Sequence, residues 1–154
     1  MATQLNPVAQ SLKNIGITVD QIGSQALFIY STPTAVALAT SGSGTAVIQI
    51  QADSVFELQR LAFSAYVTGT PDTAVTFPPV TLQINDTGSG ANLFDQPVML
   101  GTVAYGGAGF GPFPVSSPRF FAPNSTLTLS LANLSAANAY TVRVSLQGRK
   151  LFKK

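Results

Sequence analysis

The stretch SPRFFAPNSTLTLSLANLS, residues 117–135, holds the clearest strand pattern in the sequence. Within residues 126–131, leucines at the odd positions alternate with the hydroxyl residues Thr126, Thr128 and Ser130. This period of two indicates a β-strand with one buried and one outward face. The outward face carries hydroxyls and no charge. We therefore predict that Thr126 and Thr128 contact another protein, although a Thr-rich strand facing water remains an alternative.

The same period runs through the chain from Gln25 onward. Turn segments rich in Gly, Pro, Asn and Asp separate the periodic runs, and no helix of ten residues is indicated after the N-terminal segment. About eight antiparallel strands at this spacing predict an all-β fold, a single β-sandwich or jelly roll over residues 24–154. Besides the opening strand, the predicted strands are residues 25–31, 45–52, 54–67, 79–85, 96–103, 139–147 and 148–152.

Residues 1–23 have a different pattern and are predicted to form an N-terminal arm or a short helix. Asn6 suits the N-cap, Pro7 the first helical position and Gly16 the stop. A helix this short needs a partner surface to be stable. Both the arm and the helix stay open, and the candidate contacts in either case are Pro7, Leu12 and Ile15.

Composition limits the classes of protein to consider. Only 9% of the 154 residues are charged, against about a quarter in a typical soluble domain, and the mean hydropathy is +0.30. The most apolar stretch, residues 26–52, is interrupted by Ser31, Pro33 and the SGSGT of residues 41–45, so it does not predict a membrane helix. The chain is also too apolar to be disordered. These features favour a folded domain whose surface is covered by other subunits.

Four of the eight basic residues lie in the last six positions, as Arg149, Lys150, Lys153 and Lys154. They form either a solvated terminus or a contact with an acidic partner surface, for which Arg149 and Lys150 are the candidates. The rest of the chain has no basic stripe, so no direct nucleic-acid binding is expected. No secretory signal pattern and no membrane association are predicted at the N-terminus.

The segment from Val103 to Pro118 combines four Gly and three Pro with the aromatic residues Tyr105, Phe110 and Phe113. Gly and Pro predict an irregular loop, while the aromatic side chains favour burial. The loop therefore either caps one end of the sandwich or presents an aromatic contact surface to a neighbour.

Catalytic chemistry has few candidates. The absence of His and Cys excludes His-dependent triads, Cys nucleophiles, thiolate zinc sites and disulfides. No glycine-rich phosphate loop is present. We predict no enzyme, no metal, no cofactor and no small-molecule substrate.

One motif is similar to a catalytic one. Asp86-Thr87-Gly88-Ser89 resembles the signature of aspartic proteases, and YGGAGFG and LQGRKLF resemble that family's flap and its later Gly-Arg element. Asn85 precedes the motif where that family has an apolar residue. Asn-Asp-Thr-Gly is also an ordinary turn sequence, and we favour the turn.

Residues 80–152 resemble small structural proteins of tailed-bacteriophage virions. The motifs that carry the resemblance are Asp86–Gly90, Leu93–Val98, Arg119–Ser125, Tyr140–Arg143 and Gly148–Phe152. The resemblance implies a β-sandwich that decorates a phage head as a cement protein, bridging subunits of the major capsid protein and often forming small homo-oligomers. For this chain it implies a dimer or a trimer. It implies a location on the outer capsid surface of a virion assembled in the host cytoplasm.

A head-fibre or tail-associated module that binds a receptor or glycan remains the alternative, with Tyr66, Tyr105 and Phe110 as its aromatic candidates. A dimeric aspartic protease built on Asp86 is a remote one. Arg119 and Arg143 each lie in or beside a predicted strand. Each arginine forms either an ion pair within the chain, with Asp95 or Glu57, or a contact with a neighbouring subunit.

Overall fold

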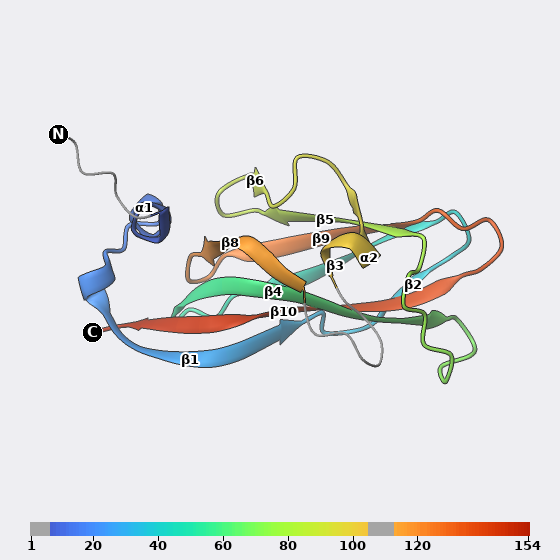
Figure 1. Cartoon of the computed structure of the whole chain (residues 1–154), viewed down its shortest axis with the longest axis horizontal. Helices are drawn as coiled ribbons and strands as arrows, with labels where there is room; N and C mark the ends of the chain where they lie inside the picture. The colour runs from blue at the N-terminus through green and yellow to red at the C-terminus, as the bar shows by residue number, and fades with distance from the viewer. Residues whose placement is uncertain (1–6, 105–112) are drawn as a thin grey trace.

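The computed structural model describes residues 7–104 and 113–154. Within these residues the chain forms two five-stranded antiparallel sheets packed face to face, so the predicted all-β sandwich is confirmed (Figure 1). The strands are β1 (Ile22–Ser31), β2 (Val36–Leu38), β3 (Ser43–Gln49), β4 (Val55–Val67), β5 (Val80–Asp86), β6 (Ala91–Asn92), β7 (Val98–Met99), β8 (Phe113–Phe121), β9 (Thr126–Asn133) and β10 (Tyr140–Lys153). The helices are α1 (Pro7–Asn14), the 3₁₀ turn η1 (Val19–Gln21) and α2 (Leu100–Val103).

The first sheet has the order β1-β10-β4-β8, with β2 pairing the start of β10 beyond the end of β1. The second has the order β3-β9-β5-β6, with β7 also pairing β5. We call them sheet A and sheet B. Strand β10 is a single strand of 14 residues, where the sequence pattern indicates two. Its register against β4 shifts at Gly148, opposite an extra residue in β4, and this bulge lets the strand continue.

The core lies between the sheets and is built as the alternation predicts. On β9, the odd-numbered residues Leu127, Leu129 and Leu131 are buried, while the even-numbered hydroxyl residues face outward. Strands β4 and β10 supply the facing layer through residues such as Phe56 and Val144. Burial of these apolar side chains is the main favourable contribution to folding.

The N-terminal segment is a helix that packs on the outside of sheet A. After the helix, Gly16 has a positive φ of 73°, a conformation that commonly ends a helix and that glycine adopts without strain. Leu12 and Ile17 are buried against Val55 and Leu151, which lie directly opposite each other in β4 and β10. Of the two alternatives for this segment, the structure shows the helix.

Two segments differ from the sequence expectation. Residues 96–103 give only the short strand β7 before the chain turns into α2. Leu100 and Ala104 are both fully buried and are joined by a backbone hydrogen bond of 2.9 Å from Ala104 N to Leu100 O. Their spacing of four places both on the core side of a helical turn, so tertiary packing selects the helix over the strand.

The second difference is β8, which begins at Phe113 inside the segment predicted as an irregular loop. Pro114 and Pro118 argue against a strand in the middle of a sheet because proline cannot donate to the ladder. Strand β8 lies at the edge of sheet A, paired only with β4 among the described strands. An edge position tolerates proline. The sequence pattern missed the strand because its prolines indicate a loop and nothing local shows that it lies at an edge.

Among the described residues, no helix has the length and apolar character needed to span a membrane.

Candidate interaction surfaces

The outward face of the three long strands of sheet B is a surface of mostly small polar side chains, hollowed between Thr45, Thr81 and Ser130. We call it the polar face. The outward positions of its three long strands carry no charged residue, and the only apolar side chains among them are those of Val47 and Ala132. Met99 of β7, opposite Thr81, adds an exposed apolar side chain at the rim of the sheet. The face is made of eleven outward positions in three paired strands: Ser43, Thr45, Val47 and Gln49 of β3; Thr126, Thr128, Ser130 and Ala132 of β9; Thr81, Gln83 and Asn85 of β5.

Hydrogen bonds hold the longer side chains of the polar face in place. Thr126 Oγ1 donates to Gln49 Oε1 at 2.7 Å, and Gln49 Nε2 donates to the carbonyl oxygen of Asn124 at 2.7 Å. Gln83 Nε2 donates to the carbonyl oxygen of Phe94 at 2.7 Å. These bonds reduce the side-chain entropy that a partner would have to remove on binding. Thr126 and Thr128, predicted as partner contacts, lie on β9, the central strand of this face, and are half-buried by their neighbours.

The outward face of sheet A is more varied. Helix α1 covers one end, where Leu12 is only 2% exposed. Beside the helix, Arg149 binds Glu57 through two bonds, Nε to Oε2 at 2.8 Å and Nη2 to Oε1 at 3.2 Å. Arg149 Nη1 also donates to Gln25 Oε1 at 2.9 Å. On the neighbouring strand β1, directly opposite Arg149, Leu27 is exposed.

Two of the four basic residues of the C-terminal segment have partners within the chain. Lys150 is 4% exposed and points into the end of the core. Its ammonium group donates to both carboxylate oxygens of Asp53, at 3.0 and 3.1 Å, and also to Gln51 Oε1. Arg149 and Lys150 therefore have partners inside the chain, whereas Lys153 and Lys154 are exposed. The sequence missed these pairs because their members are about ninety or more positions apart.

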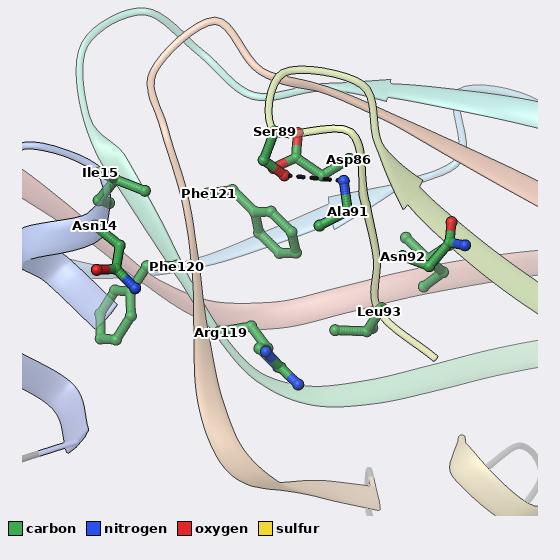
Figure 2. Close-up of a pocket in the computed structure, with 11 residues that line it drawn as sticks. Asn14, Ile15, Asp86, Ser89, Ala91, Asn92, Leu93, Arg119, Phe120 and Phe121 are labelled. Atoms are coloured by element: carbon green, nitrogen blue, oxygen red, sulfur yellow. Dashed lines mark hydrogen bonds between the residues drawn. The ribbon is translucent and has the colours of Figure 1, made fainter. Parts of the chain in front are cut away.

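A cavity of about 220 Å³ lies at the open edge of the sandwich, between β8, the loop after β5 and the end of α1 (Figure 2). Arg119 lines one side and the Asp86–Ser89 turn another (Figure 2). Arg119 is exposed and forms no ion pair with the described residues, and Arg143 likewise forms none with them. Glu57, which the sequence offers as a partner for these arginines, is bound by Arg149.

Asp86 is held by its own turn. Its Oδ1 accepts a bond from the backbone N–H of Gly88 at 3.0 Å, and its Oδ2 accepts one from Ser89 Oγ at 2.7 Å. This is the hydrogen-bonding pattern of a turn in which aspartate caps its own backbone. Of the two protease-like elements, LQGRKLF lies in β10 of sheet A, whereas Asp86 lies in sheet B. YGGAGFG lies outside the described residues.

The other predicted contact residues are scattered. Pro7 begins α1, and Ile15 follows the helix and is half-buried beside the second apolar cluster. Phe113 begins β8. Tyr105 and Phe110 lie outside the described residues, and Tyr66 is half-buried on β4. The structure thus brings Thr126 and Thr128 together on one surface. Ile15 lines the cavity beside β8 together with Arg119, and Leu12 lines another hollow together with Arg149.

The described residues contain no group of three or more His, Cys, Asp or Glu side chains placed to hold a metal ion.

Comparisons with known proteins identify no family for this chain. No family model and no curated protein matches the sequence. Two structures, titled as infectious bursal disease virus Gx strain and Gt strain, align with 89% and 90% of this chain at 12% identity, with TM-scores of 0.27 and 0.23. The chain spans 43% of the length of each of those chains. Likenesses with TM-scores this low carry no argument about fold or function.

Proposed function

We propose that this chain is a non-enzymatic structural protein of a tailed-phage virion. In this role it decorates the outer surface of the head and bridges neighbouring subunits of the major capsid protein. The observation that carries the proposal is the polar face, a three-stranded surface whose eleven outward positions carry no charge. The resemblance of residues 80–152 to virion structural proteins supports the same role.

The polar face has the properties of a surface that another protein covers. Burying a charged side chain at an interface costs several kcal/mol unless it finds a partner, and the centres of protein interfaces are depleted of charge. Burying a hydroxyl or amide group costs less free energy than burying a charge, and these groups can replace their hydrogen bonds to water with hydrogen bonds to a partner. A free surface of this size normally carries lysine and glutamate for solubility.

The residues that carry the resemblance build the sandwich. Tyr140 and Val142 are buried in the core, and Asn124 adopts a positive φ of 62° in the turn before β9. Gly148 packs against the backbone of Glu57 at the β4 bulge. The motifs that carry the resemblance therefore build the scaffold of the sandwich. This supports a structural role for the protein.

The test is binding to the shell formed by the major capsid protein of the same genome. We expect the wild-type chain to bind assembled shells at a fixed ratio, measured by co-sedimentation and by its position in an electron-microscopy map. Ser130→Lys, at an exposed position of the polar face, should lower occupancy by about tenfold because it buries an unpaired charge.

Ser64→Lys is the matched control, since Ser64 is an exposed serine in the middle of a strand on the outward face of sheet A. It should bind like the wild type, and both variants should retain the wild-type melting temperature. The proposal fails if the wild-type chain does not bind the shell. It also fails if Ser130→Lys binds as well as Ser64→Lys does.

A further inference from the structure

We propose that two copies of this chain associate through antiparallel pairing of their β1 strands, about a two-fold axis at Phe28. The occupant of the β1 edge is thus a second copy of the chain. This inference does not depend on the proposed virion role, because it rests on the edge of sheet A rather than on the polar face.

Strand β1 is an unprotected edge. It is ten residues long and pairs only with β10 among the described strands (Figure 1). Its sequence, IGSQALFIYS, has no charged residue and no proline, and its only irregularity is a register shift between Ile22 and Ser24. Natural edge strands are usually protected by lysine, proline or a bulge. From Ser24 to Ser31, after the register shift, β1 has none of these and is competent to pair with another strand.

The opposite edge of sheet A is protected in this way. Strand β8 contains Pro114 and Pro118, followed by Arg119. Proline lacks the N–H that a new ladder needs. Among the described strands of sheet A, β1 is therefore the edge that is open to a further strand.

The direction of the free backbone groups follows from one hydrogen bond. The N–H of Thr32 donates to the carbonyl oxygen of Val144 at 3.0 Å, and these residues continue the register that pairs Ser31 with Ser145. Hydrogen-bonded pairs alternate along an antiparallel ladder, so the even-numbered residues of β1 point their backbone groups toward β10. The odd-numbered residues point theirs toward the free edge, and these are Gln25, Leu27, Ile29 and Ser31.

The same odd-numbered residues carry the exposed apolar side chains. Leu27 is 83% exposed and Ile29 is 58% exposed, both on the outward face of sheet A. Exposed apolar side chains on an unpaired edge strand lose water contact when a second strand pairs alongside. Backbone and side chains thus favour the same kind of partner, an extended strand.

A second copy of β1 fits this edge in a self-complementary register. With the two-fold axis at Phe28, Leu27 lies opposite Ile29 of the second copy, and Gln25 lies opposite Ser31. Apolar residues then meet apolar residues, polar meet polar, and no charges oppose each other. The odd-numbered residues of both strands would make about eight backbone hydrogen bonds. Such an isologous contact closes at two copies.

Strand β3 is the competing edge. It is seven residues long and has one exposed large apolar side chain, Val47. Its shorter ladder and more polar residues make it the weaker candidate. It also supplies a matched control, because Thr45 and Val47 are exposed at alternate positions of an edge strand, as Leu27 and Ile29 are.

The experiment is sedimentation equilibrium of the purified chain and three double variants. We expect the wild type to have twice the 16.0 kDa mass of one chain. Leu27→Lys with Ile29→Lys places lysines opposite each other twice across the axis, and should weaken the dimer by about a hundredfold or more. Leu27→Glu with Ile29→Lys places opposite charges across the same pairs and should keep the dimer. Thr45→Lys with Val47→Lys should also keep it.

Circular dichroism should show that all variants are folded. The proposal is overturned if the wild type is monomeric or trimeric. It is likewise overturned if the β3 variant dissociates while the β1 lysine variant does not, or if the Glu–Lys variant dissociates as readily as the Lys–Lys variant.

Discussion

Lys150 and Asp53 form an ion pair at the end of the core, with Nζ 3.0 Å from Oδ2, in which only the carboxylate reaches solvent. The Lys150 side chain is 5% exposed and the Asp53 side chain 52%. The ammonium group also lies 4.4 Å from the centre of the Phe28 ring. Burial of a lysine end group is tolerated here because a carboxylate, an amide oxygen and an aromatic face surround it.

The first prediction concerns the pH dependence of this pair. A hydrogen bond from Ser54 Oγ and the nearby Lys150 ammonium lower the pKa of Asp53 below its ordinary value of 3.8. A carboxyl group with a lowered pKa in the folded state stabilises the fold above 3.8 and loses this contribution as the pH falls through its folded value. Asp53→Asn should therefore be less stable than the wild type near neutral pH, and the difference should shrink below about pH 4.

Urea denaturation of both proteins at a series of pH values measures this difference. Ser54→Ala removes the largest cause of the shift, so in that background the stabilisation by Asp53 should be lost at a higher pH. A difference between wild type and Asp53→Asn that stays constant down to about pH 3 would contradict the prediction.

The second prediction concerns the pair between Arg149 and Glu57 on the outward face of sheet A. The Glu57 side chain is 6% exposed, whereas that of Arg149 is 36% exposed. Arg149→Leu should cost about 1–2 kcal/mol of unfolding free energy, because it leaves a buried carboxylate without its partner. The double variant with Glu57→Gln should be less destabilised than the sum of the two single changes.

Chemical denaturation of the four proteins in this double-mutant cycle gives the coupling energy. Arg143→Leu is the matched control, since Arg143 is an exposed arginine of the same strand without an ion pair to the described residues. It should change stability by less than about 0.5 kcal/mol. Equal losses from Arg149→Leu and Arg143→Leu would show that the pair contributes nothing.

The third prediction concerns Gly148. A Cβ atom at this position would overlap the backbone carbonyl oxygen of Glu57 and lie 3.1 Å from the Phe56 ring. Backbone atoms of a central strand cannot move aside as a flexible side chain can. Gly148→Ala should cost about 3 kcal/mol or more, or prevent folding.

Thermal denaturation measures this loss, with Gln147→Ala as the control. Gln147 is the neighbouring half-buried position, and its variant should have nearly the wild-type melting temperature. A Gly148→Ala protein with wild-type stability would mean that the β4 bulge relaxes to admit the methyl group.

The fourth prediction concerns the docking of α1 on sheet A. Leu12 is buried with Ile17, Val55 and Leu151 outside the main core. Leu12→Ala should cost about 2 kcal/mol or more in the stability of this region. Hydrogen exchange should show faster opening of α1, with the strands of the main core little changed.

Lys13→Ala serves as the control, because Lys13 is the exposed neighbour on the same helix. Unchanged protection of α1 in Leu12→Ala would show that the apolar cluster does not hold the helix.

The alternation of apolar and polar residues was enough to determine several elements. It predicted β4, β5 and β9 to within about two residues, because each has one buried and one outward face. Pro7 and Gly16 marked the bounds of a possible helix, since their backbone preferences are local, but the sequence left an extended arm open as well. The charge-free face of β9 was also visible in residues 126–131. These features depend on neighbours within a few positions along the chain.

Strand order, register and side-chain partners were decided by the tertiary structure. Period two shows which face of a strand is apolar, but not which strand lies beside it. Only the fold brings Arg149 to Glu57 and Lys150 to Asp53, places β8 at an edge where proline is tolerated, and turns residues 100–103 into a helix. It also decides that β1 ends its sheet and that the hydroxyls of β9 join those of β3 and β5 in one face. These outcomes follow from packing between distant segments, which no local pattern in the sequence records.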